Sequence, residues 1–215
     1  MNATVARLHG ALRPLAPQRL SGRADRAAVE LLGSLLVRQL GHTRVIARIV
    51  ETEAYREDDP ASHSHRGRTP RTAPMFAAAG TAYVYRSYGL HWLLNVSVED
   101  EGVGAAVLLR AATVIDGLTE VRERRLAARR DAELLSGPGR LTVGLEVDGP
   151  RHDHLPLLTG DGTLRLADDG WEPDAADIVA GPRVGISQAA DVPWRFHLSG
   201  VDSVSSYRRS PRAPR

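Results

Sequence analysis

Cysteine and lysine are both absent from this chain of 215 residues. Without cysteine, the chain can form neither disulfides nor thiolate-ligated zinc sites. Without lysine, no side-chain amine can form a Schiff base, so that only the N-terminal amine could do so. All 28 basic residues are therefore arginine, whose planar guanidinium makes paired hydrogen bonds to phosphate or carboxylate.

Long apolar runs and nucleotide-binding motifs are missing too. No stretch approaches the roughly 20 apolar residues of a membrane span, so we expect no membrane association. Neither a GxGxxG nor a Walker motif occurs, which argues against a fold that cradles nucleotide phosphates, and we expect no cofactor. A net charge of +2 permits a basic face that binds nucleic acid without requiring one.

Aromatic residues make up only 5% of the chain, yet they gather in one stretch. Three of the five tyrosines and one of the three tryptophans lie within residues 81–95, which suggests a stacking surface. Alternating side chains predict two strands, Tyr83–Tyr88 and His91–Val98, that meet at a hairpin tip around Gly89. An aromatic ring at such a tip, here Tyr88, is a natural wedge between stacked bases.

Two glutamates, Glu51 and Glu53, stand near the end of a strand expected over Arg44–Thr52. Residues two apart on a strand point to the same face, and two neighbouring carboxylates raise the pKa of at least one of them. That would suit a general base. The other interpretation is a solvated strand end with no chemical role.

A long polar segment follows, from Arg56 to Pro74, and a loop of this size is typical of a lid or binding segment. Within it, His63 and His65 stand near Asp58, so that a metal-dependent hydrolase is one hypothesis. Surface histidines explain the pattern equally well, and we expect no metal.

Three further positions have both a functional and a structural interpretation. Tyr83 and Tyr85 share one strand face, where aromatic residues usually pack in the core. Asn95 could contact a base edge or cap a turn. Arg110, expected at the end of a strand over Ala105–Ala111, could bind a phosphate or pair with Glu51 or an aspartate.

The remaining pattern predicts an α+β protein. Further expected elements are a helix from Asp25 with Asp25 as its cap and Ala28, Leu31, Leu32 and Leu35 on one face, a strand Leu35–Leu40, a helix Gly117–Ala128 capped by Asp116, a short helix ending at Leu145, loops and edge strands over Asp148–Asp177, and closing strands Val184–Ile186 and Trp194–Leu198. Strands joined by hairpins favour a single domain with a curved, mostly antiparallel sheet, flanking helices and a protruding β-hairpin. We expect this domain over residues 1–205, with a flexible segment 1–23 and a disordered basic tail 206–215.

Taken in order, the segments resemble the alkyladenine (3-methyladenine) DNA glycosylase family. The matching segments are Arg48–Tyr55, Ala61–Ser64, Thr69–Arg71, Met75–Phe76, Gly80–Tyr85, Tyr88–Gly89, Asn95, Val107–Arg110, Ser136–Pro138 and Arg183–Ile186. They span about Asp25 to Phe196, and their number and order make the resemblance far more specific than a single short motif.

The resemblance implies a monofunctional base-excision enzyme that flips a damaged purine from double-stranded DNA and hydrolyses its N-glycosidic bond. It implies that Glu53 is the general base and that Arg110 holds the water and the DNA backbone near it. Tyr55, His63 and Tyr85 would line the pocket and sandwich the base, Asn95 would disfavour a guanine-type amine, and Tyr88 would fill the vacated stack. The preferred lesion stays open. We expect a monomer in the bacterial cytoplasm, where the nucleoid lies.

The residues by themselves also fit a non-catalytic nucleic-acid-binding module. An antiparallel sheet that presents aromatic rings and arginines is sufficient for such binding. The two hypotheses differ in Glu53, whose carboxylate only the enzyme requires.

Overall fold

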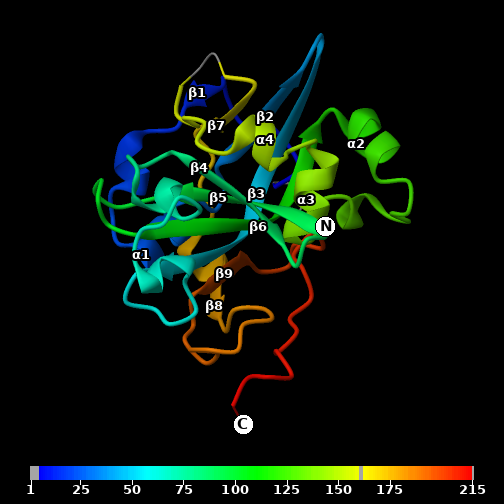
Figure 1. Cartoon of the computed structure of the whole chain (residues 1–215). Coiled ribbons are helices and arrows are strands. Elements are labelled where there is room, and N and C mark those ends of the chain that lie inside the picture. Colours follow the sequence, from blue (N-terminus) through cyan, green and yellow to red (C-terminus); the bar gives the residue numbers. More distant parts are fainter. Residues whose placement is uncertain (1–4, 160–161, 215) are drawn as a thin grey trace.

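One antiparallel sheet dominates the computed structural model, which describes residues 5–159 and 162–214. Its strands follow the order β1-β7-β2-β3-β6-β5-β4, and β9 joins β3 to β8 (Figure 1). Every pairing among the described strands is antiparallel. The strands are β1 Arg13–Pro14, β2 Leu35–Leu40, β3 Thr43–Arg56, β4 Ala82–Ser87, β5 His91–Ser97, β6 Ala105–Asp116, β7 Leu164–Asp168, β8 Ile178–Gly181 and β9 Arg195–Leu198.

Short helices flank this sheet. They are α1 Ala24–Glu30, α2 Leu118–Arg124, α3 Pro138–Gly144 and α4 Gly149–His152, with 3-10 turns at Pro17–Leu20, His63–Arg66, Ala73–Phe76, Asp131–Glu133 and Ala175–Asp177. Within the described ranges, no helix is long and apolar enough to cross a membrane. The predicted α+β single-domain fold is confirmed, as are β2 and the hairpin of β4 and β5. The helix predicted to end at Leu145 is present as α3 and ends one residue earlier, at Gly144.

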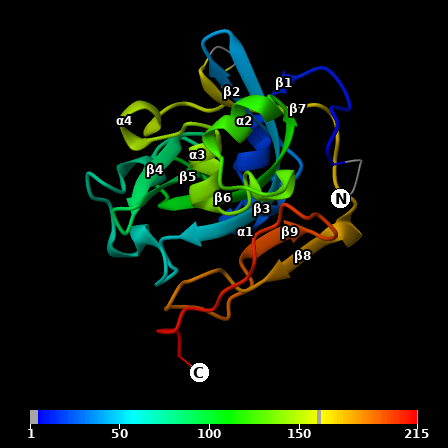
Figure 2. The same ribbon diagram turned by 90° about the vertical axis from the view of Figure 1, so that its right-hand side faces the viewer.

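Strand β3 is the centre of the fold. β-Branched residues, which favour extended backbone, fill much of its 14-residue length. One edge pairs with β6, whereas the other edge is shared by β2 and then by β9. Strand β9 therefore lies along β3 and β8 along β9, away from α2 and α3 in both views (Figures 1 and 2). The pairing of β3 with β6 shifts register around Glu51, and such bulges re-aim the neighbouring side chains.

Both central strands run further than predicted. β3 continues to Arg56 and β6 to Asp116, so that Glu53 and Arg110 lie inside strands rather than at strand ends. The expectation of a solvated strand end is wrong, because the side chains of Glu51 and Glu53 are fully buried. Arginines from β6 and β9 pair with these carboxylates, and because their charges are compensated, β3 can continue past both glutamates inside the protein.

Helix α1 begins one residue earlier than predicted, and Asp25 is not its N-cap. The cap position is Arg23, and the first backbone N–H, of Ala24, is bound by the Glu99 carboxylate at 2.9 Å. Asp25 lies in the first turn instead, where a negative charge favours the positive end of the helix. Leu35, expected on the same helical face, belongs to β2.

Helix α2 also differs, because it ends at Arg124 rather than Ala128. Arg125 leaves helical geometry, with φ −122° and ψ 45°, and its Nε binds a backbone carbonyl of the following segment. Asp116 does not cap the helix, because its carboxylate accepts the N–H of the adjacent Gly117.

Two predictions for the C-terminal half are wrong. Val184–Ile186 forms no strand, because the Val184 N–H binds the Glu53 carboxylate and Gly185 has a φ of +73°. Strand β7 is not an edge strand, since it lies between β1 and β2.

A buried ion pair fastens the segment before β1 to the sheet. Arg48 binds both oxygens of Asp169, at 3.0 and 2.7 Å, and its guanidinium lies 4.7 Å from the Trp171 ring centroid. The same guanidinium donates to the carbonyls of Val5 and Arg7. Burial alone would raise the pKa of Asp169, but the bonds from Arg48 and from a backbone amide outweigh it and lower that pKa to about 2.

The described residues near the two ends of the chain have little regular structure. Residues 206–214 contain no helix or strand, although the Arg208 carbonyl accepts the Gly185 N–H at 2.9 Å. Residues 1–4 and 215, which belong to the ends expected to be flexible, lie outside the described residues. The mobility of both ends and the domain bounds at 1–205 stay predictions.

Candidate active site

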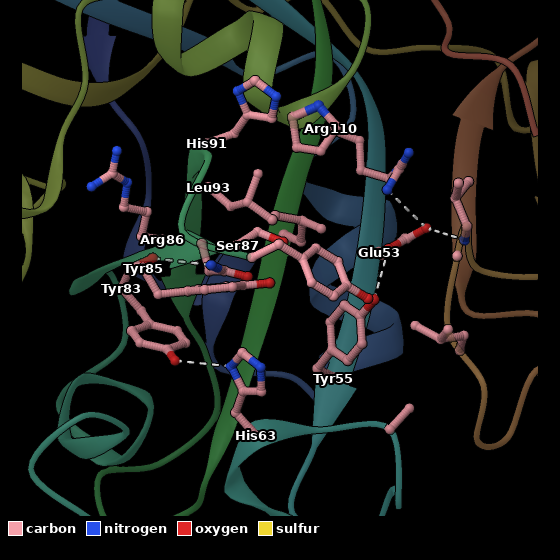
Figure 3. Close-up of a pocket in the computed structure, with 18 of the residues that line it drawn as sticks. Glu53, Tyr55, His63, Tyr83, Tyr85, Arg86, Ser87, His91, Leu93 and Arg110 are labelled. Carbon is pink, nitrogen blue, oxygen red and sulfur yellow. Dashed lines mark hydrogen bonds and ion pairs between the residues drawn. The ribbon is translucent and has the colours of Figure 1, made fainter. Parts of the chain in front are cut away.

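A pocket of about 720 Å³ opens beside the C-terminal half of β3. The hairpin of β4 and β5, the polar segment after β3 and the segment at Val184 form its other sides (Figure 3). The residues to which the family resemblance gives a role all line this one pocket: Glu53, Tyr55, His63, Tyr85, Tyr88, Asn95 and Arg110.

The Glu53 carboxylate lies at the floor of the pocket and faces hydrogen-bond donors only. Its Oε2 accepts from the Tyr55 hydroxyl at 2.8 Å, and its Oε1 accepts from the Val184 N–H at 2.7 Å (Figure 3). Arg110 Nη1 lies 3.3 Å from Oε1. Burial and the Glu53 charge raise the pKa of Tyr55 well above its usual value, so the Tyr55 hydroxyl stays a donor. The arrangement holds an acceptor oxygen in a fixed position.

Glu51, the other glutamate of the pair, is a structural partner of arginines. Its Oε1 accepts from Arg110 Nε at 2.8 Å and from Arg195 Nε at 2.7 Å, and Ser205 binds both carboxylate oxygens. Burial raises the pKa of Glu51, but the two arginines outweigh it, so that the net shift is downward. Of the two glutamates, one of which was predicted to have a raised pKa, Glu51 is not the one. Its ion pair instead aims Arg110 at Glu53.

Three rings form the opposite wall. Tyr83 and Tyr85, which share a strand face as predicted, stack with centroids 5.3 Å apart and planes 28° apart. The His63 ring meets Tyr85 edge-on at 4.6 Å, and its Nδ1 shares a hydrogen bond of 2.9 Å with the Tyr83 hydroxyl (Figure 3). Burial raises the pKa of Tyr83 to about 12 and that of Tyr85 further still, so that both phenols remain neutral.

His63 is expected to be neutral at pH 7. Burial first, and then the charge of Arg71, lower the pKa of this imidazole below its usual 6.5. An NMR titration, with the signal assigned by its loss in His63→Gln, should give a midpoint below 6.5. Arg71→Met should move the midpoint upward, because one source of repulsion is removed. A wild-type midpoint above 6.5 would contradict this prediction.

The metal-site candidates of the polar segment point at different partners. His63 binds Tyr83, whereas the His65 Nδ1 lies 3.0 Å from a backbone carbonyl and Asp58 pairs with Arg56. No group of three or more potential ligands that could hold a metal ion occurs in the described part of the chain.

Asn95 lies on β5, buried to 4% exposure. Its Nδ2 donates to the Tyr83 carbonyl of the paired strand at 3.0 Å. Since it lies inside a strand, it caps no turn. The bond to β4 fixes where the amide stands on the pocket wall.

Tyr88 lies at the hairpin tip, 90% exposed. Its backbone has a φ of +49°, in the left-handed region that residues other than glycine rarely adopt, and Gly89 follows at +70°. Leu90, on the same tip, is 71% exposed. The hairpin therefore presents an apolar tip to solvent at the mouth of the pocket.

The sequence did not reveal several of the groups that complete the site. The Val184 N–H is a backbone donor, which leaves no signature in residue type, although it lies in a segment that carries the family resemblance. Arg195 and Ser205 bind Glu51. Arg195 lies in β9, which was predicted only as a closing strand, and Ser205 lies after it. Their partners lie more than a hundred residues away in the chain, so no local pattern links them.

Comparison with known proteins agrees with this geometry. Residues 18–202 match the methylpurine-DNA glycosylase family. A relative from Rhodococcus jostii is 48% identical over 87% of this chain and 82% of its own length, and one from Nocardia farcinica is 48% identical over 87% and 89%. A third, from Rubrobacter xylanophilus, is 44% identical over 80% and 87%. Each bears the name 3-methyladenine DNA glycosylase as a provisional assignment. The chain belongs to the methylpurine-DNA glycosylase family.

Proposed function

We propose that this protein is a monofunctional DNA glycosylase, which flips an alkylated or deaminated purine out of duplex DNA and hydrolyses its N-glycosidic bond. The product is DNA with an abasic site. The observation that carries the proposal is the buried Glu53 carboxylate at the floor of a ring-walled pocket, with the exposed Tyr88 at its mouth. The family and the names of the relatives support the same reaction.

Glu53 acts as the general base. A carboxylate near the sugar stabilises the oxocarbenium-like state while it takes a proton from the attacking water. Arg110, held by Glu51, orients that water and the nearby DNA backbone. An alkylated purine carries positive charge and leaves readily, so the site has little need of a general acid. Because the chain has no lysine, no lysine Schiff base can support a lyase step.

The flipped base lies between Tyr55 on one side and Tyr85 with His63 on the other. A cationic base gains roughly 0.5–2 kcal/mol from stacking on aromatic faces compared with a neutral one. A neutral His63 adds no repulsion to that cation. Asn95, fixed to β4 by its own hydrogen bond, disfavours a guanine-type exocyclic amine by steric contact.

Tyr88 occupies the space that the flipped nucleotide leaves. Taking a base out of the stack costs a few kcal/mol, and a ring in the gap offsets part of this cost. The left-handed backbone of Tyr88 fits such a role, because strained residues concentrate at functional sites. The partner is double-stranded DNA with damaged purines, bound by a monomer in the bacterial cytoplasm beside the nucleoid.

A base-release assay tests the proposal. The wild-type protein is incubated with duplexes that contain 3-methyladenine, 7-methylguanine, hypoxanthine or ethenoadenine, and the free base is identified by mass. Release of at least one of them, with an abasic site left behind, is the expected result. DNA binding without release from any duplex would favour the non-catalytic nucleic-acid-binding module instead.

A further inference from the structure

We propose that Arg183 and Asp59 are a positioning pair that fixes the donors of Glu53, an inference that rests on the proposed glycosylase reaction. Neither side chain touches the Glu53 carboxylate. They act through Tyr55 and through the Val184 amide, which both do.

The Arg183 guanidinium is fully buried and donates several hydrogen bonds. It binds both oxygens of Asp59, through Nη1 and through Nη2 at 3.1 Å, and Nη1 also donates to the Ala54 carbonyl at 2.9 Å. Its central carbon lies 4.7 Å from the Tyr55 ring centroid. Because the guanidinium covers one face of this ring, only the other face is open to the pocket. The plane of Tyr55 is thus set by Arg183.

These contacts join three segments that are far apart in the chain. Asp59 lies in the polar segment that carries His63, Ala54 and Tyr55 lie on β3, and Arg183 precedes the Val184 amide. Holding Arg183 in place therefore holds the next backbone N–H against Glu53 Oε1. The hydrogen bonds from Tyr55 and from the Val184 N–H to Glu53 therefore both depend on the Arg183 guanidinium, which does not itself contact the Glu53 carboxylate.

The same type of ion pair occurs a second time in this protein, away from the pocket. Arg48 is likewise fully buried, binds both oxygens of Asp169 and lies 4.7 Å from the centroid of a ring, here Trp171. Within the part of the chain that the structure describes, the hydrogen-bond partners of the Arg48 and Asp169 side chains all lie outside the pocket. This pair is a matched control for the loss of a buried, ring-stacked arginine and its carboxylate.

The experiment compares two double variants, Arg183→Met/Asp59→Asn and Arg48→Met/Asp169→Asn. Each removes both charges together, which is better tolerated in a protein interior than the removal of one. We measure the single-turnover rate of base release, the Kd for a duplex with an abasic-site analogue, and the Tm. A misplacement of about 1 Å can lower a rate roughly 100-fold. We therefore expect Arg183→Met/Asp59→Asn to lower the single-turnover rate of base release about 100-fold and to leave the Kd unchanged.

The control pair should lower the Tm but keep the wild-type rate. If the Arg183 double variant does not fold, Arg183→Lys serves instead, because it keeps the charge but cannot make all the bonds of the guanidinium; its rate should also fall. A wild-type rate in the Arg183 variants, or an equal rate loss in the control pair, overturns the positioning pair while the glycosylase reaction stands. A wild-type protein that releases no base overturns both.

Discussion

Replacing Glu53 with glutamine is expected to lower the rate of base release by roughly 10²- to 10⁴-fold, which is the usual contribution of a general base. Glutamine has nearly the same shape, but its amide nitrogen is a donor. Both Glu53 oxygens already accept hydrogen bonds, from Tyr55 and from the Val184 N–H, so that the new amide must place its NH₂ against one of these donors. The variant therefore loses both the proton acceptor and the fixed position of the side chain.

Binding should survive this change, because Glu53 is buried at the pocket floor and does not reach the DNA surface. The measurements are single-turnover release from a lesion duplex and the Kd for a duplex with an abasic-site analogue. Glu172→Gln, at an exposed position outside the pocket, is the charge control and should keep wild-type activity. Full activity in Glu53→Gln would remove Glu53 from the role of base.

Replacing Tyr88 with alanine is expected to slow release from duplex DNA roughly 10- to 100-fold, since the stacking of one base on an aromatic ring is worth about 1–3 kcal/mol. The ring is 90% exposed, so its loss removes almost no packing inside the protein. The Tm should therefore stay at the wild-type value, in contrast to any variant of a buried residue.

Comparing a lesion in a duplex with the same lesion in a bulge tests whether Tyr88 acts by filling the gap in the base stack. A base that is already unpaired or single-stranded costs less to flip, so the defect of Tyr88→Ala should shrink when the lesion lies in a bulge. Tyr88→Phe keeps the ring and should behave like the wild type on both substrates. An equal loss in duplex and bulge would show that Tyr88 does not act on the stack.

Much of the fold follows from local patterns in the sequence. Alternating apolar residues and the glycine at position 89 are sufficient to predict β4, β5 and the tip that carries Tyr88. The ends of β3 and β6 were not predictable in this way, because Glu53 and Arg110 have the appearance of strand ends. Burial of a carboxylate depends on its partners, and those partners come from other strands.

In the candidate site, too, some residues follow from local sequence patterns and others depend on distant parts of the chain. Tyr85 and Asn95 are placed by strand pairing, which period-two alternation predicts, and His63 is brought to them through Tyr83. The donors of Glu53 were harder to find. A backbone N–H at Val184 has no residue signature, and the segment around it has the composition of a strand although hydrogen bonds to β3 and a left-handed glycine hold it as a loop.

Each of the two buried carboxylates of β3 obtains a backbone N–H donor only long after β3 itself has been made. The amide that binds Glu53 is 131 residues downstream, and the Ser205 amide that binds Glu51 is 154 residues downstream. On the ribosome the central strand emerges long before either of them, since the N-terminal part of a chain is made first. Tyr55 and Arg110 are made earlier, but burial of a carboxylate is costly unless its hydrogen bonds are satisfied, so the site reaches its full set of donors only after the two late amides are in place. A product truncated before Val184 would therefore lack a complete site, however well its earlier strands had paired.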